Sequence, residues 1–205
     1  MEIENLEKKV EELLKERGKR KFKQTVELIV VLKDVDIKEL KNKIQEIYVP
    51  NSIQSKVIIF SEVKKIEGIE HYTPKDIEEI SKSKRVSRKF ARSFDFALSD
   101  QKLIPLIGKL LGKFLAVKGK MPKPILDEKN LSETVERLKR SVRVNLKQNQ
   151  IQLKIGKEDM EKEKLIENIR AVLNQIVENL PEGEKNIKKI YLKLTMSKPI
   201  KIYAQ

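Results

Sequence analysis

The chain has 205 residues, 39% of them hydrophobic and 37% charged, so it can bury a sizeable core in one domain or two. Its 45 Lys and Arg against 31 Asp and Glu give a net charge of +14, which implies nucleic acid, an anionic membrane surface or an acidic protein as partner. The absence of cysteine excludes disulfides and every cysteine-based metal site or catalytic mechanism.

A helix and then strands are predicted for the N-terminal quarter. From Ile3 to Leu14 apolar residues recur at helical spacing, with Lys and Glu on the other face, which predicts an amphipathic helix over 3–16. A β-branched, mostly apolar run predicts a buried strand at 25–33, and shorter runs predict strands at 43–49 and 56–60. The polar residues 34–43 fit either a loop or a short helix.

Strands and helices alternate in the middle of the chain. Thr73, Pro74 and Asp76 form a helix start, because Thr caps the first turn, Pro suits the first position and an acid complements the helix dipole. The other expected elements are a strand at 94–99, helices at 101–111 and 131–139, and a loop rich in Gly, Pro and Lys at 112–124. This alternation predicts a parallel, doubly wound sheet.

The C-terminal third returns to strands around one long helix. A hairpin is expected at 142–156, with its turn at 148–150, and apolar residues at helical spacing predict a helix over 161–179. Strands are expected at 187–196 and 199–203.

The two ends of the chain therefore share a pattern that the middle lacks. We predict an α/β (α+β) fold of two domains, in which residues 1–56 and 143–205 form a discontinuous α+β domain. Residues 57–142 would form a second, inserted domain.

Basic residues gather in four stretches that contain no acid. These stretches are 17–26, 82–94, 101–126 and 185–205. Lys and Arg held near phosphates release counterions, which favours nucleic-acid binding without reading sequence, although each stretch could also be a solvated face. Phe22, inside the first stretch, could pack on a ribose or base, or could be a core residue that begins the following strand.

No catalytic or metal-binding set can be assembled. The single histidine, His71, has no specific Ser or Asp partners and cannot form a two-histidine metal site. The stretch from Gly112 to Gly119 and Lys120 fails the phosphate-loop pattern, because six residues separate the glycines and Met121 follows the lysine. We therefore expect no enzyme, no cofactor and no metal.

A membrane role is also disfavoured. Residues 1–18 lack the apolar core of a secretory signal, and no stretch approaches the 18 apolar residues of a membrane span. A membrane-surface helix would need a basic polar face, whereas residues 2–16 carry more acids than bases. We expect a cytoplasmic protein.

Three segments stand out in order along the chain: RKFKQTVEL at 20–28, LIPLIGKLLGKFLAVKGKMPKP at 103–124 and YLKLTMSKPIKI at 191–202. Together they resemble the ribosomal protein L-one family, most closely its archaeal branch. The resemblance covers nearly the whole chain, and IENIRAVLN at 166–174 is similar to a family helix.

The resemblance implies a split α+β domain with an inserted Rossmann-like domain. It implies a structural protein of the large ribosomal subunit that binds large-subunit (23S) rRNA at the mobile lateral stalk, as a monomer within the ribosome. It further implies a link to release of exit-site tRNA, and repression of translation by binding the protein's own mRNA. A ribosome-biogenesis factor of the same fold, which binds precursor rRNA transiently, is the alternative; the absence of long basic extensions favours the ribosomal protein.

The resemblance also carries over RNA-binding residues. The matching positions are Lys21, Phe22, Thr25, Glu27, Thr195, Met196 and Ser197. A secondary basic loop would contribute Lys118, Lys120 and Lys123. Thr can bond ribose hydroxyls, Met and Phe give apolar contact, and Lys meets phosphate.

The sequence departs from the family pattern at three places. The family has Thr-Met-Gly-Pro where Ser197 and Lys198 follow Met196 here, so Ser197 must fit the gap of a glycine or displace the RNA. Ala116 and Val117 replace a Gly-Pro pair, and residues 51–54 replace a glycine-rich turn.

Overall fold

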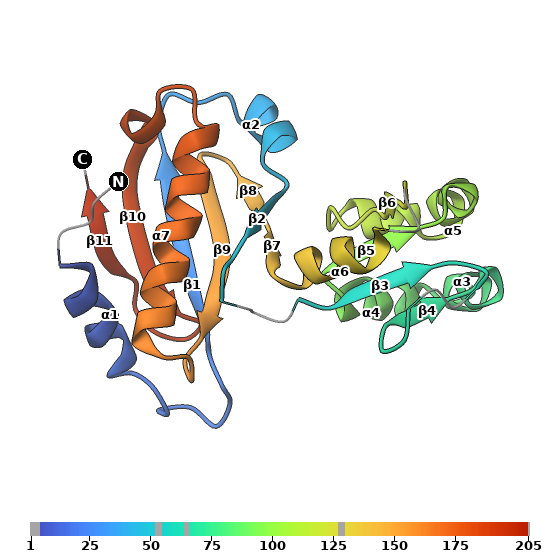
Figure 1. Ribbon diagram of the computed structural model, residues 1–205, viewed down its shortest axis with the longest axis horizontal. Helices are drawn as coiled ribbons and strands as arrows, with labels where there is room; N and C mark the ends of the chain where they lie inside the picture. The colour runs from blue at the N-terminus through green and yellow to red at the C-terminus, as the bar shows by residue number, and fades with distance from the viewer. Residues whose placement is uncertain (1–4, 52–54, 64–65, 127–129, 205) are drawn as a thin grey trace. The chain divides into compact units, whose positions relative to one another are not determined.

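The structure is a computed structural model that describes residues 5–51, 55–63, 66–126 and 130–204. The protein has a mixed α/β fold with several sheets, as the sequence predicts (Figure 1). Backbone contacts divide the chain into two compact units: unit 1 is Met1–Ile53 with Arg140–Gln205, and unit 2 is Gln54–Lys139. The two junctions between the units lie three residues before the predicted junctions at 56/57 and 142/143.

Unit 1 contains a five-stranded antiparallel sheet of order β11-β10-β1-β9-β8. Its strands are β1 (Thr25–Leu32), β8 (Asn145–Lys147), β9 (Gln150–Lys157), β10 (Ile187–Leu194) and β11 (Ile200–Ala204). A separate antiparallel pair joins β2 (Glu46–Tyr48) to β7 (Ser141–Arg143). The predicted hairpin is present as β8 and β9, while β7 leaves it to pair with β2.

Only one face of the five-stranded sheet is fully buried. Alternate residues of β1 from Val26 to Leu32 are buried, and those from Thr25 to Val31 are half-buried. The predicted buried strand is thus buried at alternate residues only, because an antiparallel sheet can leave its second face uncovered.

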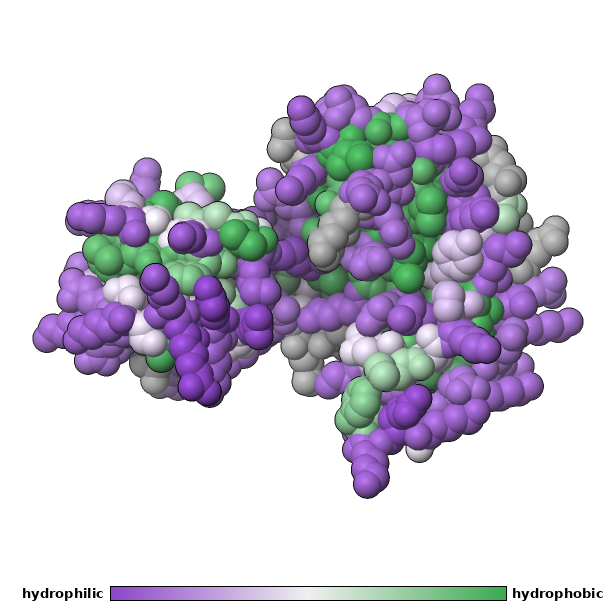
Figure 2. Space-filling view, turned by 180° about the vertical axis from the view of Figure 1, so that it is seen from behind, coloured by the Kyte–Doolittle hydropathy of each residue, from purple (hydrophilic) through white to green (hydrophobic). Residues whose placement is uncertain are grey.

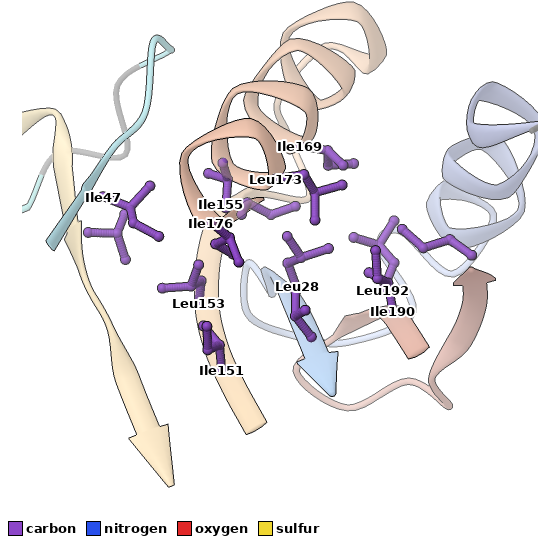
Figure 3. Packing of buried hydrophobic residues seen from close by; sticks show 14 of the residues in the cluster. Leu28, Ile47, Ile151, Leu153, Ile155, Ile169, Leu173, Ile176, Ile190 and Leu192 are labelled. Carbon is purple, nitrogen blue, oxygen red and sulfur yellow. The ribbon is translucent and has the colours of Figure 1, made fainter. Parts of the chain in front are cut away.

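Two helices cover the buried face of this sheet. Helices α1 (Leu6–Leu14) and α7 (Lys162–Asn179) share one apolar cluster with the sheet. In Figure 3 Leu28 of β1 and Ile190 of β10 lie beneath Leu173 and its neighbours on α7. The prediction for α7 is confirmed, and α1 ends at Leu14, two residues before the predicted end. Ile3 lies outside the described residues.

Helix α2 (Ile37–Lys43) settles the ambiguous polar segment as helix. The side chain of Asp36 accepts hydrogen bonds from the N–H groups of Lys38 (2.7 Å) and Glu39 (3.4 Å). This cap satisfies two of the amides that a helix leaves unpaired at its start. A short 3-10 helix, η2 (Gly183–Asn186), precedes β10.

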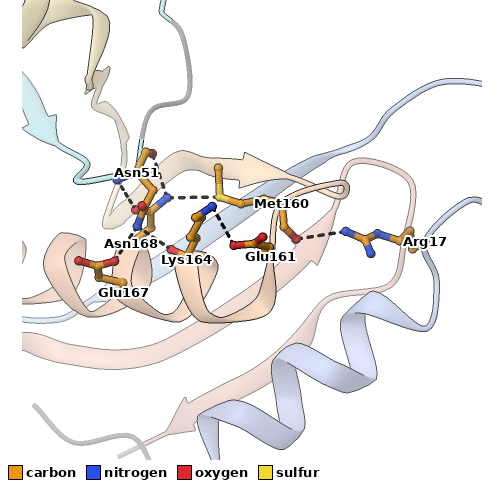
Figure 4. Close-up of polar contacts among 7 residues, drawn as sticks. All are labelled: Arg17, Asn51, Met160, Glu161, Lys164, Glu167 and Asn168. Carbon is orange, nitrogen blue, oxygen red and sulfur yellow. Dashed lines mark hydrogen bonds and ion pairs between the residues drawn. The ribbon is translucent and has the colours of Figure 1, made fainter.

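A buried amide fixes the chain after β2. Asn168 of α7 is fully buried, and its Oδ1 accepts from the N–H of Asn51 (2.9 Å). Its Nδ2 donates to the carbonyls of Asn51 (3.2 Å) and Ile155 (2.9 Å), as Figure 4 shows for the Asn51 pair. Asn51 thus holds the chain onto α7 where the family's glycine-rich turn is replaced; residues 52–54 lie outside the described part.

Unit 2 contains a four-stranded parallel sheet of order β4-β3-β5-β6, which confirms the predicted parallel arrangement. Its strands are β3 (Val57–Phe60), β4 (Glu70–Tyr72), β5 (Phe96–Ser99) and β6 (Lys123–Pro124). Helices α3 (Pro74–Ser81), α4 (Lys84–Ser93) and α5 (Ile104–Ala116), the last preceded by η1 (Gln101–Leu103), pack on one face. Helix α6 (Leu131–Lys139), as predicted, packs on the other. Every residue of β3 and β5 is buried as a result.

The start of α3 follows the predicted chemistry. The Thr73 N–H and hydroxyl both donate to Asp76 Oδ2 (2.7 Å each), and the Asp76 N–H donates to Thr73 Oγ1 (3.4 Å). The reciprocal bonds form a capping box with Pro74 in the first turn. Hydrogen bonds from Thr73, first from its backbone N–H, lower the pKa of Asp76.

Three features of unit 2 differ from expectation. Helix α5 continues past its predicted end at 111 to Ala116, within the region 112–124 that was predicted to be a loop. Buried Leu115 extends the apolar stripe of the helix past Gly112. That loop also contributes β6. Strand β4 was not predicted because it is short and polar. Helix α4 was not predicted because it is rich in cations.

Among the described residues, no helix is long and apolar enough to cross a membrane. In the same part of the chain, no group of three or more His, Asp or Glu is placed to hold a metal ion. His71 lies on β4, where its Nε2 is 3.0 Å from the carbonyl oxygen of Ile66.

Candidate nucleic-acid interface

The beginning of β1 and the end of β10 bring the two predicted RNA-binding threonines together. Val26 pairs with Leu194 in the antiparallel register, so Thr25 and Thr195 follow at the same end of the sheet. The Thr195 N–H donates to the Thr25 carbonyl (3.1 Å), and the Thr25 N–H donates to Thr195 Oγ1 (3.2 Å). Residues 170 positions apart in sequence therefore form one rigid corner.

Ser197 closes the tight turn that follows this corner. Its N–H donates to the Leu194 carbonyl (3.0 Å), and its Oγ accepts from the Leu194 N–H (2.9 Å). The Ser197 hydroxyl therefore lies on the backbone of the turn, at the position where the resemblance implies a glycine. Met196, at the tip, is left 57% exposed.

A buried amide holds this turn from below. Gln24 Oε1 accepts from the Met196 N–H (3.1 Å), and Gln24 Nε2 donates to Glu158 Oε2 (3.2 Å). Gln24 and Glu158 are 2% and 6% exposed. Neither residue was predicted from the sequence; the only local sign is the uncharged, polar Gln24 near the end of the first basic stretch, directly before the apolar strand.

Arg17 secures the same region from the side of α1. Its guanidinium donates to the backbone carbonyls of Glu158 and Met160, the latter at 3.1 Å (Figure 4). Arg17, which belongs to the first basic stretch, therefore has a structural role. It holds the segment that carries Glu158 against the residues before β1.

Phe22 is a surface residue, with 52% of its area exposed, so it does not begin the core of β1. It stands two residues before Gln24, whose side chain bonds the Met196 backbone. Two residues of chain span at most roughly 7 Å, so Phe22 lies in the same region as Met196. We call Lys21, Phe22, Thr25, Glu27, Thr195, Met196 and Ser197 the Thr–Met surface.

The cations around Phe22 differ in their availability. Lys19 pairs with Glu16 (2.6 Å) and Lys23 with Asp159 (2.6 Å), and the hydrogen bond to Asp159 raises the pKa of Lys23. Arg20 and Lys21 have no such partner among the described residues, and both are exposed. These two cations can therefore meet an external anion without losing an internal ion pair.

Glu27 extends the Thr–Met surface onto the uncovered face of the sheet. The register places it opposite Lys193 of β10 and Lys154 of β9. Directly opposed side chains in a sheet lie about 4.5–5.5 Å apart at Cβ, so two lysine stems flank this carboxylate. Tyr191 stands on the same face, opposite Ile29. Figure 2, which views the molecule from behind, shows hydrophobic patches of unit 1 bordered by hydrophilic side chains.

The secondary basic loop belongs to unit 2 and is only partly open. Lys118 is exposed, whereas Lys120 and Lys123 are half-buried. The Lys120 ammonium donates to the Phe94 carbonyl and lies 5.3 Å from the centre of the Phe94 ring. Lys120 therefore ties this loop to the end of α4, which leaves Lys118 as the freest cation of the three.

The protein is basic and has a mixed α/β fold. No described helix covers the second face of its unit 1 sheet, and the exposed side chains of Phe22 and Met196 lie near unpaired cations. These features define a protein whose surface suits a polyanion. The sequence over residues 13–198 matches the Ribosomal protein L1p/L10e family, and the chain belongs to that family.

Curated relatives extend over almost the whole chain. Similar proteins include the large ribosomal subunit protein uL1 of Thermococcus kodakarensis, 38% identical over 89% of this chain and 89% of the relative. The uL1 proteins of Thermofilum pendens and Methanocaldococcus jannaschii are 37% and 35% identical, over 97% and 98% of this chain and 92% and 96% of their own lengths.

Proposed function

We propose that this protein is a structural constituent of the large ribosomal subunit in the cytoplasm, where it binds the rRNA of the mobile lateral stalk as a monomer. Family membership supports the ribosomal setting. The observation that carries the binding site is the corner of Thr25, Thr195 and Met196, held by Gln24. Such a corner presents its side chains at fixed positions, which recognition of a folded RNA requires.

The chemistry of the surface divides into positioning and recognition. Arg20 and Lys21 attract and position phosphates, which carry no sequence information. Phe22 and Met196 offer exposed apolar surface to a ribose or base, and Glu27 can accept a hydrogen bond from a 2′-hydroxyl or a base amino group. The Thr195 hydroxyl bonds the Thr25 backbone and stabilises the corner, and its remaining acceptor capacity can be offered to an RNA hydroxyl or amino group.

We also propose that units 1 and 2 are the split RNA-binding domain and the inserted Rossmann-like domain. Separate apolar clusters in the two units support this division. The link to exit-site tRNA release and repression of the protein's own mRNA belong to the same proposal. An mRNA element that resembles the stalk rRNA would compete for the Thr–Met surface, which provides a mechanism for repression.

Replacement of Thr195 tests the site. Thr195→Val should lower affinity for a stalk-rRNA fragment by about 1–3 kcal/mol, the scale for leaving polar partners unpaired. Thr195→Ser keeps the hydroxyl and is the matched control, expected to bind nearly as the parent does. Fluorescence anisotropy gives the affinities, and circular dichroism verifies that both variants are folded. Unchanged affinity in folded Thr195→Val would remove Thr195 from the interface.

Co-sedimentation tests the ribosomal role against the biogenesis alternative. A structural constituent should sediment with mature large subunits at a constant ratio. Presence on precursor particles alone would instead show a maturation factor and would overturn the proposal.

A further inference from the structure

The most one-sided charge of the described structure lies on α4 of unit 2 and just before it. Residues 82–94 carry six cations and no acid. The cations are Lys82, Lys84, Arg85, Arg88, Lys89 and Arg92, and every one of them is exposed. Three of the chain's nine arginines stand at 85, 88 and 92, a spacing of three and four that aligns them along one face of the helix.

This sequence disfavours the helix that it forms. Lys84 and Arg85 occupy the first turn, where cations oppose the helix dipole, and the turn contains no acid. Like charges stand four residues apart at Lys84 and Arg88 and again at Arg88 and Arg92, an arrangement that destabilises a helix. Ser83 at the N-cap makes no capping bond among the described residues.

Several lysines on other helices are neutralised by nearby acids. Lys43 pairs with Glu39 on α2 (2.6 Å), and Lys139 with Glu136 on α6 (2.7 Å). Lys164, on α7, pairs with Glu161 at its cap (2.8 Å). None of the six cations of residues 82–92 has an ion-pair partner in the described part of the chain. Other helices also carry cations without an ion-pair partner among the described residues, such as Lys75 on α3 and Lys109 on α5. What distinguishes α4 is that six such cations stand within eleven residues that contain no acid.

Burial of its opposite face holds α4 in place. Phe90 and Ala91 are buried, and the Phe90 ring lies 4.9 Å from the Tyr72 ring and 5.3 Å from the Phe94 ring, centre to centre. The Ser87 hydroxyl, also buried, donates to the Ile80 carbonyl (2.9 Å). Because the apolar face is committed to the core of unit 2, the cationic face is fixed outward.

We propose that the cationic face of α4 is a second RNA-contacting surface, which binds the phosphate backbone of double-helical RNA without reading its sequence. From Lys84 to Arg92 the helix rises roughly 12 Å, enough to meet several successive phosphates. Arginine suits this role, because its planar guanidinium bonds two phosphate oxygens at once. The surface belongs to unit 2 and uses no residue of the Thr–Met surface.

An anionic membrane or an acidic protein would also attract these cations. A membrane-surface helix needs a bulky apolar face to insert, whereas the apolar residues of α4 are buried except for Val86. Membership in a family of ribosomal proteins places the chain among RNA, which favours the nucleic acid over an acidic protein.

A pair of triple variants of the full chain tests this surface. Arg85→Gln with Arg88→Gln and Arg92→Gln removes three charges from α4, and Lys75→Gln with Lys102→Gln and Lys109→Gln removes three exposed charges elsewhere on unit 2. Affinity for a double-helical RNA unrelated to the stalk is measured by fluorescence anisotropy between 50 and 200 mM salt. The arginine variant should bind about tenfold or more weakly at the lowest salt, and the slope of log affinity against log salt should fall by about two to three. The lysine variant should change little.

Further readouts separate this inference from the proposed function. Thr195→Val should weaken stalk-fragment binding and leave the unrelated duplex unaffected, whereas the arginine variant should weaken the duplex even if the Thr–Met surface proves irrelevant. The melting temperature of the arginine variant should equal or exceed that of the parent, since like-charge repulsion is relieved. Equal salt slopes for the two triple variants would overturn the proposal. So would an arginine variant that retains duplex affinity but loses binding to anionic vesicles or to an acidic peptide.

Discussion

The two main sheets of the protein differ in how many of their faces the helices cover. In unit 1 the antiparallel sheet has α1 and α7 on one face and leaves residues such as Glu27 and Tyr191 half-buried on the other. In unit 2 the parallel sheet has helices on both faces, and β3 and β5 are buried throughout.

This difference determines what kind of surface each unit can offer. The uncovered face of the unit 1 sheet presents side chains such as Glu27 and Tyr191 at positions set by the backbone register, which would suit recognition of a particular RNA shape. The covered sheet has only the outer surfaces of helices to offer, and on α4 these carry long, mobile cations suited to attraction without specificity. These surfaces fit the proposals that unit 1 recognises a particular RNA and that unit 2 adds affinity without specificity.

The largest expected effect separates the cores of the two units. Phe60 is fully buried in unit 2, with its ring 6.0 Å from Tyr72 and 6.1 Å from Phe90, so Phe60→Ala should destabilise that unit by about 3–5 kcal/mol. Hydrogen exchange followed by mass spectrometry should show loss of protection in unit 2 alone, with stalk-fragment binding retained. Leu28→Ala in unit 1 is the counterpart and should abolish that binding. Equal loss of stalk-fragment binding in both variants would contradict the proposal that unit 1, and not unit 2, recognises the stalk RNA.

A smaller effect is expected from the support beneath the Thr–Met surface. Gln24→Leu leaves the Met196 N–H and the buried Glu158 carboxylate without their partner, and should reduce the free energy of unfolding by about 1–3 kcal/mol. Stalk-fragment affinity should fall with it, because the turn at Met196 loses its anchor. Lys23→Gln is the control at the neighbouring, exposed position and should leave urea unfolding almost unchanged. Comparable losses of unfolding free energy in the two variants would mean that Gln24 contributes no more to the stability of the turn than an exposed neighbour does.

The smallest effect contrasts two helices within unit 2. Asp76→Asn removes the charge from the capping box of α3 and should cost about 0.5–1 kcal/mol at neutral pH. Because the folded-state pKa of Asp76 is lowered, its contribution is present above the ordinary carboxyl pKa and is lost as the pH falls below about 4. Urea-unfolding curves of parent and variant should therefore converge in acid.

Ser83→Ala at the start of α4 is the matched change for the same measurement. Ser83 donates and accepts no capping bond within the described structure, so the substitution should leave stability unchanged. A cost as large as that of Asp76→Asn would show that α4 depends on its N-cap, and would weaken the view that core packing alone maintains it.

Local sequence patterns predicted the elements that are specified by a short run of residues, such as a cap or an apolar periodicity. The Thr73 cap and the apolar spacing of α7 are both present as expected. Helix α4 escaped prediction because its few apolar residues are embedded among cations, and only packing in unit 2 reveals that Phe90 and Ala91 share a face.

The candidate site was predictable only through family resemblance. Thr25 and Thr195 meet because β10 pairs with β1, and no local pattern reveals that pairing across 170 residues. Gln24 and Glu158 escaped notice because a buried polar pair is recognised by its partners and not by its residue types. The division of the chain into domains and the roles of the Thr–Met residues stay predictions.

The pairing of β2 with β7 has a consequence for how the chain can be rearranged. Tyr48 lies opposite Ser141, and the Val49 N–H donates to the Arg140 carbonyl (2.9 Å), while Asn51 is fastened to α7. Along the chain, unit 2 therefore stands between two paired strands of unit 1, where a hairpin loop would otherwise connect them. A gene that joined Asn51 to Arg140 through a short turn would encode unit 1 with its strand order intact, because closing a short loop costs little entropy.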